Sequence, residues 1–146
     1  MSCFAPLPKY QIGGSAQGEH TRELLEHGFG DGVGFAKAGT NGKGETSTPP
    51  LSGYRVIDAT QGYAGPFAGL LLAEAGADVI KIEPPEGDYA RGFSPEGSNG
   101  DSCLFMALNR NKRGIVLDMA REDDRQQYKS LVKTSDILIE DWGPGI

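Results

Sequence analysis

The hydrophobic and polar positions of residues 51–83 follow the order of one β-α-β unit. Residues 54–59 form a short run with β-branched residues that predicts a strand, and glycine and proline then break the chain. Apolar residues with helical spacing follow over residues 67–75, and Gly76 stands where a C-terminal cap is expected. Residues 78–83 predict a second strand. Two strands joined by one helix should be parallel, and their loops should open at the carboxyl edge of the sheet, where ligands bind in such folds.

The pattern further along the chain predicts the same alternation of strands and helices. Residues 102–108 form an apolar turn of helix, and residues 115–117 predict a third strand. Residues 121–134 have the spacing of an amphipathic helix with an acidic first turn, and residues 137–139 predict a fourth strand. The sequence therefore predicts an α/β fold with an open, doubly wound, Rossmann-like parallel sheet.

The first fifty residues do not share this pattern. Residues 1–29 are an extended, proline-containing segment with one short helix, residues 18–26, which Thr21 can cap. Residues 30–50 are rich in glycine and end in two prolines, which is typical of a flexible linker. We therefore expect the folded domain to comprise residues 51–146.

Composition limits the classes of function. With 146 residues, of which 38% are hydrophobic and 23% charged, the chain can form one domain with a modest core. The net charge of −6 argues against a general nucleic-acid surface, although a local basic pocket for a phosphorylated metabolite remains compatible with it. The sequence has no run of about eighteen apolar residues and no secretory signal pattern, so we predict no membrane association and a cytoplasmic location.

Common catalytic and nucleotide-binding motifs do not match. The glycines at 62, 65 and 69 lack the spacing of the dinucleotide fingerprint, and no Walker-type lysine follows them. No serine lies in a G-x-S-x-G elbow. Binding of NAD or ATP in the usual modes, and a serine triad, are therefore disfavoured.

The histidines and cysteines do not form a metal-site pattern either. His20 and His27 have no acidic or cysteine companions at ligand spacing, so we interpret them as solvated or capping residues. Cys3 and Cys103 lie about a hundred positions apart, which favours two reduced thiols. We predict no metal ion.

Two polar segments near the expected ligand edge each have two interpretations. Residues 84–101, which include Arg91, are either a surface excursion or a binding loop after the second strand. Residues 109–113, N-R-N-K-R, are either a solvated basic turn or an anion clamp in which Lys112 and Arg113 face a phosphate group. The residues alone leave both pairs open.

Six short motifs occur in a fixed order within residues 51–145, and together they are specific although each alone is weak. They are L-x-G-x-R-V-x-D at 51–58, A-G-P at 64–66, L-L-A-x-x-G-A-D-V-I-K-I-E-P-P at 71–85, N-R-N-K-R at 109–113, L-D at 117–118 and S-D-I-L-I-E-D-W-G-P-G at 135–145. This set resembles the amino-terminal half of the large domain of the family III CoA-transferases. That family includes formyl-CoA transferase, carnitine CoA-transferase and the α-methylacyl-CoA racemases.

The amino-terminal segment carries a second resemblance to the same family. Residues 6–8, P-L-P, then residues 18–25, G-E-H-T-R-E-L-L, and residues 28–29, G-F, resemble the family's carboxyl-terminal tail. A tail that precedes a head implies two units fused in tandem, as in the bacterial enzymes that add CoA to dimethylsulfoniopropionate and cleave it. We therefore expect this chain to be a piece of a longer protein, with residues 30–50 as the joint.

The resemblance implies a covalent mechanism and its partners. In the family, an aspartate carboxylate attacks an acyl-CoA thioester, an aspartyl-CoA thioester forms, and an acceptor carboxylic acid leaves as the new CoA ester. That aspartate belongs to a segment beyond the G-P-G motif, so no catalytic residue is assigned here. Relatives form interlocked homodimers, and we expect the same, or a tandem pseudo-dimer, for the full-length protein.

The resemblance also implies the residues that contact CoA. They are Tyr63, Ala64, Leu117, Asp118, Met119, Ala120, Asp141, Trp142 and Gly143, with Lys112 and Arg113 as the clamp. Three positions depart from the family pattern: Pro84 stands where some relatives have arginine, Ala120 where some have lysine, and Asp141 where asparagine is usual. Each change makes the edge less positive towards a phosphorylated ligand. Trp142 can pack either on the ligand or in the core.

Three functions follow as alternatives. The first is the CoA-binding part of an acyl-CoA:carboxylate CoA-transferase. The second is a racemase of the same fold, which would use acid and base residues outside this sequence. The third is a non-catalytic half of a tandem enzyme with a structural or dimer-forming role.

Overall fold

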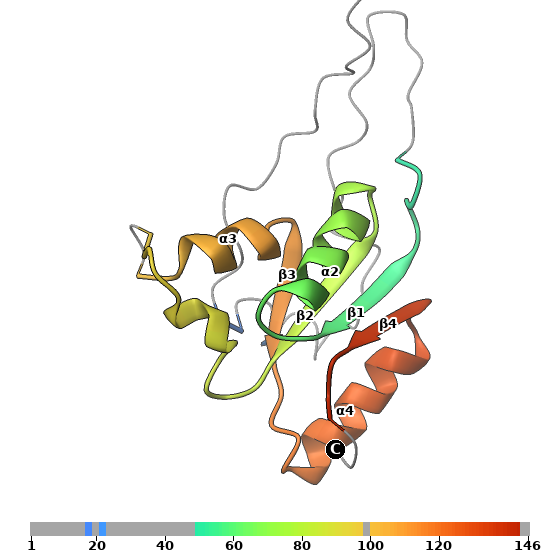
Figure 1. Ribbon diagram of the computed structural model, residues 1–146. Helices are drawn as coiled ribbons and strands as arrows, with labels where there is room; N and C mark the ends of the chain where they lie inside the picture. The colour runs from blue at the N-terminus through green and yellow to red at the C-terminus, as the bar shows by residue number, and fades with distance from the viewer. Residues whose placement is uncertain (1–16, 19–20, 23–48, 98–99, 144–146) are drawn as a thin grey trace, which may run out of the picture.

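Four parallel strands form one sheet in the order β3-β2-β1-β4 (Figure 1). The structure is a computed structural model that describes residues 17–18, 21–22, 49–97 and 100–143. The strands are β1 (Arg55–Ala59), β2 (Asp78–Glu83), β3 (Lys112–Val116) and β4 (Ile137–Glu140). From β1 the chain moves outward to β3 and then crosses to the other side of β1. This order is that of a doubly wound sheet, and the predicted fold class is confirmed.

The helices cover both faces of the sheet. They are α2 (Ala64–Glu74), the 3₁₀ helix η1 (Tyr89–Gly92), α3 (Cys103–Asn109) and α4 (Glu122–Lys133). Neighbouring strand residues point to opposite faces. Ile57 and Ile80 accordingly pack with Leu131 of α4, whereas Val56 and Val79 pack with Ala73 of α2. Among the described residues, no helix has the length and apolar character that crossing a membrane requires.

The observed helices and strands differ from the predicted ones mainly in the residues at which α2 and β3 begin. Helix α2 begins three residues before the predicted start, and its first turn contains Pro66, whose missing N–H is harmless there. Gly76 has a φ of +100° just after the helix, as predicted for a C-terminal cap. Strand β3 begins at Lys112, three residues earlier than expected, because Lys112 and Arg113 continue the backbone pairing with Val79 and Ile80.

The interpretation of residues 109–113 as a solvated basic turn, one of the two left open, is therefore wrong for its last two residues. Lys112 and Arg113 are 1% and 5% exposed and lie within the sheet. Their charges made the segment look like a turn, but Arg113 meets a carboxylate on the neighbouring strand β2, and Lys112 reaches across β2 to Asp58 on β1. Arg113 pairs with Asp78, the first residue of β2, and thus lies near the amino end of that strand.

A buried ion pair lies between α2 and the sheet. Lys112 Nζ donates to Asp58 Oδ2 at 2.7 Å, to the Pro66 carbonyl at 2.8 Å and to Asn109 Oδ1 at 2.9 Å. The side chains of Lys112 and Asp58 are both 0% exposed. A Cβ on Gly69 would lie only 2.7 Å from Asp58 Oδ2. The helix can therefore lie directly on this pair only because position 69 has no side chain.

Burial and pairing act in opposite directions on the two groups. Burial lowers the pKa of Lys112 to about 8, although the charge of Asp58 and its hydrogen bond act to raise it. Burial alone would raise the pKa of Asp58, but Lys112 and Lys81, together with hydrogen bonds from Lys112 and Thr60, lower it overall. The pair is thus ionised at neutral pH, and Lys112 loses its proton at a lower pH than an exposed lysine does.

Described residues of the amino-terminal segment contact the sheet near its outer strand. The Val116 N–H donates to Thr21 Oγ1 at 3.1 Å, and Gln17 Nε2 donates to the carbonyls of Pro84 and Pro85 at 3.2 and 2.9 Å. Thr21 and its neighbour Arg22 are helical. Residues 19–20 and 23–26 of the predicted helix, both histidines, Cys3 and residues 30–48 of the predicted linker lie outside the described residues.

We predict that Gly69→Ala lowers the free energy of unfolding. Alanine favours a helix by about 1 kcal/mol over glycine, but overpacking against a buried ion pair costs about 1–3 kcal/mol, so we expect a net loss of up to about 2 kcal/mol. Urea unfolding measures this. Gly92→Ala is the matched control, because a Cβ there meets nothing within 4 Å. Equal stability of the two variants would contradict the close approach of α2.

We predict that the ¹³Cε resonance of Lys112 titrates near pH 8, well below the ordinary lysine value of 10.5. Between these values the folded chain binds fewer protons than the unfolded chain, so the contribution of Lys112 makes the free energy of unfolding rise with pH. This contribution should vanish in the double variant Asp58→Asn, Lys112→Met. A midpoint for Lys112 at its ordinary value would disprove the burial of its charge.

Candidate functional site

The carboxyl ends of the four strands meet at one edge of the sheet, and hydrogen bonds connect the segments that follow them. The Gln61 N–H donates to Asp141 Oδ2 at 3.1 Å and joins the ends of β1 and β4. The Gly62 N–H donates to Asp88 Oδ1 at 3.0 Å and joins the segments after β1 and β2. The Leu117 N–H donates to the Glu83 carbonyl at 3.0 Å and joins β3 to β2. The predicted contact segments after β1, β3 and β4 are thus brought to the same edge.

The turn after β1 has an unusual backbone shape. Gly62 has a φ of +80°, and a Cβ at this position would overlap the Tyr89 hydroxyl. Tyr63 follows with 60% of its surface exposed, and α2 then begins at Ala64 with no side-chain cap and no acidic residue in its first turn. The turn therefore presents backbone and an aromatic ring to the solvent side of the edge.

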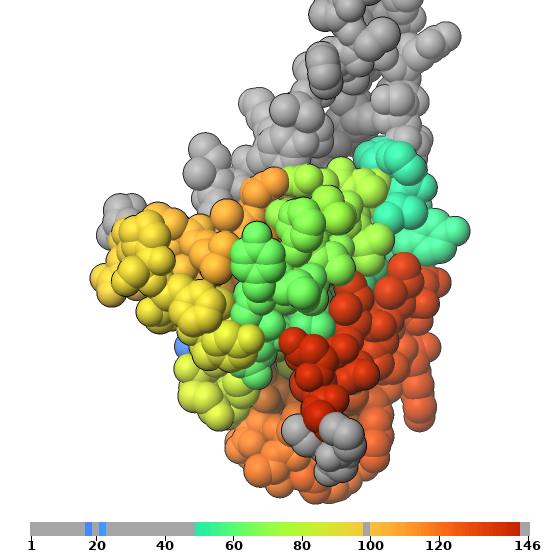
Figure 2. Space-filling model, in the orientation of Figure 1, coloured from blue at the N-terminus to red at the C-terminus, as the bar shows by residue number. Residues whose placement is uncertain are grey.

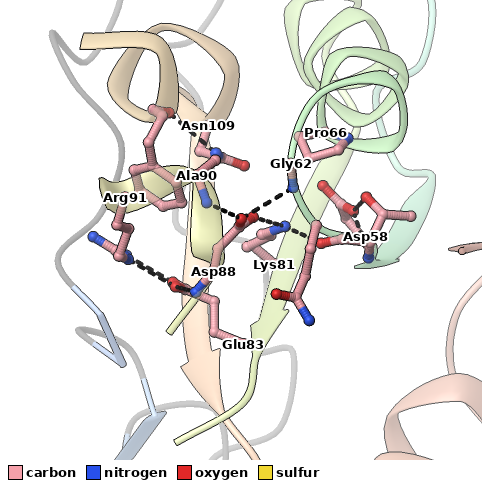
Figure 3. Close-up of polar contacts among 12 residues, drawn as sticks. Asp58, Gly62, Pro66, Lys81, Glu83, Asp88, Ala90, Arg91 and Asn109 are labelled. Atoms are coloured by element: carbon pink, nitrogen blue, oxygen red, sulfur yellow. Dashed lines mark hydrogen bonds and ion pairs between the residues drawn. The ribbon is translucent and has the colours of Figure 1, made fainter. Parts of the chain in front are cut away.

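A buried ionic network lies beneath this turn (Figure 3). Lys81 Nζ lies 2.9 Å from Asp88 Oδ2 and also donates to the Thr60 carbonyl. Glu83 accepts two hydrogen bonds from Arg91, from Nε at 2.8 Å and from Nη2 at 2.7 Å. Apart from Arg91, these charged side chains are almost completely buried. The network fixes the segment after β2 to the face of the sheet that carries α2.

Arg91 is held inside this network. Its guanidinium lies 3.8 Å above the centre of the Phe105 ring and pairs with Asp101 at 3.0 Å as well as with Glu83. Burial would lower the pKa of Arg91, but hydrogen bonds and charge from Glu83 and Asp101 raise it overall. Residues 84–101 contain η1, and Glu96 forms an isolated bridge with Ser102, which follows them. Arg91 therefore stabilises this loop.

The start of α4 shapes the segment after β3. Leu117 is only 2% exposed and belongs to the core, and its N–H is bonded to the Glu83 carbonyl. Asp118 Oδ1 accepts a hydrogen bond from the Ala120 N–H at 2.9 Å, while the Asp118 N–H donates to Asp124 Oδ2 at 2.8 Å. Met119 packs partly against the core. Ala120 and the next residue, Arg121, are exposed at this edge.

The segment after β4 has one polar and one aromatic member. Asp141 is exposed, and its carboxylate holds the Gln61 N–H. Trp142 is partly buried, packs against the core and lies 5.3 Å from the Tyr128 ring, centre to centre. Gly143 is exposed, and a Cβ there would meet nothing within 4 Å. The structure thus places Trp142 against the core, which was one of its two predicted positions.

Lys112 and Arg113 do not join this edge as exposed cations. Both are paired with carboxylates inside the sheet, and we leave them out of the proposed ligand site.

Sequence analysis did not identify Lys81, Glu83 and Asp88 as important residues. A signal was present, because β2 alternates isoleucine with charged residues over D-V-I-K-I-E, which predicts one charged face in a buried strand.

Aromatic and apolar side chains are exposed beside the turn. Figure 2 shows the start of α2 in green and the region of η1 in yellow side by side on one face. The exposed members are Tyr63, Phe67, Leu71, Tyr89 and Phe93, each at least 40% exposed.

The part of the chain that the structure describes contains no group of three His, Cys, Asp or Glu residues that could hold a metal ion.

Comparison with known proteins identifies the family of the chain. The model of CoA-transferase family III matches residues 51–146. The succinyl-CoA–L-malate CoA-transferase β subunit of Chloroflexus aurantiacus is 42% identical over 103 residues, which cover 70% of this chain and 25% of that protein. A formyl-CoA:oxalate CoA-transferase of Rhodopseudomonas palustris is 44% identical over 100 residues, covering 68% and 24%. The chain thus spans about a quarter of the length of these relatives.

Solved structures show the same arrangement. A CAIB/BAIF family protein from Brucella suis superposes with a TM-score of 0.61 at 38% identity, over 66% of this chain and 26% of that chain. A hypothetical protein from Mycobacterium tuberculosis gives a TM-score of 0.61 at 39% identity, over 67% and 27%. The family model covers more than half of the sequence, so this chain belongs to CoA-transferase family III.

Proposed function

We propose that this chain supplies the CoA-binding part of an acyl-CoA:carboxylate CoA-transferase. The observation that carries the proposal is the hydrogen-bonded convergence of the segments after β1, β2, β3 and β4 at one edge. Ligands of doubly wound sheets bind at this edge. The relatives named above are CoA-transferases, which supports transfer over racemisation.

The proposed CoA site uses backbone groups together with apolar surface. Backbone donors and acceptors at Tyr63 and Ala64, and in residues 117–120 and 141–143, would meet the adenine and pantetheine parts of CoA. The exposed rings of Phe67 and Phe93 offer apolar surface to the pantetheine or the acyl group. Substrates of the relatives' class are an acyl-CoA and a small carboxylic acid, and we propose the same class here.

We propose that the reaction proceeds through an aspartyl-CoA thioester on an aspartate outside this sequence. Several of the aspartates described here have other roles. Asp58 and Asp88 are buried and paired with lysines, and Asp78 is paired with Arg113. A nucleophilic carboxylate must reach the thioester carbonyl, and these groups are held inside the fold.

The tandem arrangement remains a proposal with one supporting contact region. Gln17 and Thr21 of the tail-like residues 1–29 bond to the loop after β2 and to β3. These contacts are compatible with a fusion of two transferase units, in which such a tail lies next to the unit that follows it. Isothermal calorimetry with CoA on the full chain tests the main proposal, and absence of binding would refute it.

We predict that Asp141→Asn tightens CoA binding. The asparagine Oδ1 can still accept the hydrogen bond from the Gln61 N–H, while a negative charge near the phosphates of CoA is removed. For an exposed charge we expect about a two- to fivefold gain in affinity, which diminishes at high salt. Calorimetry at two salt concentrations measures this gain. Weaker binding by the variant would show that the carboxylate charge itself is required.

We predict that Arg121→Ala weakens CoA binding by a similar factor of about two to five. Arg121 is the exposed cation next to Ala120, where some relatives have lysine. In this proposal it supplies the positive charge that we had expected from Lys112 and Arg113. Lys133→Ala is the matched control, because it removes the same charge about 18 Å away along α4. Equal losses in both variants would indicate a non-specific charge effect.

A further inference from the structure

Asp88 links two segments that the proposed site needs. Its Oδ1 accepts hydrogen bonds from the Gly62 N–H at 3.0 Å and from the Ala90 N–H at 2.9 Å. Its Oδ2 lies 2.9 Å from Lys81 Nζ, and its side chain is 0% exposed. One carboxylate therefore joins the turn after β1 to the first turn of η1 (Figure 3).

Tyr89 joins the same two segments independently. A Cβ at Gly62 would overlap the Tyr89 hydroxyl, so the tyrosine covers the glycine directly. The φ of +80° at Gly62 is a conformation that other residues adopt with strain. The turn thus has a hydrogen bond to Asp88 and a close contact with the Tyr89 hydroxyl, and both come from neighbouring residues of one loop.

Lys81 makes the buried carboxylate possible. It reaches from the middle of β2 to Asp88 and to the Thr60 carbonyl, which immediately precedes the turn. A buried carboxylate without such a partner would be strongly destabilising. The pair therefore holds the end of β1, the turn and η1 as one unit.

We propose that Asp88 is a positioning residue for CoA. It does not contact the ligand, because its side chain is completely buried. By fixing the Gly62 N–H, it sets the direction in which the backbone of Tyr63 and Ala64 faces the ligand edge. This proposal rests on the proposed function, since it assumes that CoA binds at that turn.

Two substitutions in the full chain separate positioning from stability. Asp88→Ala removes the acceptor, whereas Asp88→Asn keeps an Oδ1 acceptor for the Gly62 and Ala90 N–H groups but removes the charge that pairs with Lys81, which lowers stability. We expect Asp88→Ala to weaken CoA binding about tenfold or more, and Asp88→Asn to stay within about threefold of the unmutated chain. Val79→Ala, a buried change near the amino end of β2, is the control and should lower stability without changing CoA affinity.

Amide hydrogen exchange at Gly62 provides a readout that does not need CoA. We expect protection of the Gly62 amide to fall about tenfold in Asp88→Ala and to persist in Asp88→Asn and in Val79→Ala. If Asp88→Ala does not fold, the double variant Lys81→Met, Asp88→Leu removes the acceptor together with both charges and should show the same losses.

The outcomes separate this proposal from the one on which it rests. An unmutated chain that does not bind CoA refutes the proposed function, and a lack of binding at this turn also ends the positioning role. CoA binding that is unchanged in Asp88→Ala, or unchanged protection of the Gly62 amide, overturns the positioning role while the proposed function stands. Equal losses of affinity in Asp88→Ala, Asp88→Asn and Val79→Ala would reduce Asp88 to a structural residue and likewise overturn it.

Discussion

The buried ion pairs on the face of the sheet that carries α2 are the constraint on which the rest depends. They join Lys112 to Asp58, Lys81 to Asp88 and Arg91 to Glu83. Removing such charges from water costs several kcal/mol per ion, so each pair is tolerated only with good geometry and further hydrogen bonds. Because the partners come from different strands and loops, satisfying all three pairs at once requires one arrangement of the segments after β1 and β2.

Glycine determines how close the covering layer comes to these charges. Gly69 allows α2 to lie on Asp58, and a Cβ on Gly65 would overlap Thr60. Gly62 admits the Tyr89 hydroxyl. The three glycines that fail as a dinucleotide fingerprint therefore have a shared physical role, which is to let backbone and helix approach a polar layer. A phosphate-binding loop also uses glycine for close approach, but there the ligand takes the space that protein atoms take here.

Helices and strands could be predicted where the pattern of neighbouring residues indicates them. The ion pairs could not be predicted from the sequence. Strand β2 was predicted with its observed bounds, because β-branched residues are enclosed there by glycine and proline. The start of β3 was missed because Lys112 finds its partner Asp58 at a separation of 54 residues, and Arg113 finds Asp78 at 35. Local pattern cannot reveal such partners. The segments that the family resemblance named after β1, β3 and β4 lie at one edge, but the resemblance did not indicate that Lys112 and Arg113 are paired with carboxylates inside the sheet.

Because these cations are paired inside the fold, buried and exposed residues have different roles in the proposed site. Lys81, Arg91 and Lys112 neutralise carboxylates of the fold, so the potential that a phosphorylated ligand meets depends on exposed groups such as Arg121 and Asp141. Exposed charges can change at little cost to stability, because solvent screens them. The buried network cannot change in this way, since it holds the turn that the proposed CoA site uses. The interior thus fixes where the donors point, and the surface sets how strongly a negative ligand is drawn to them.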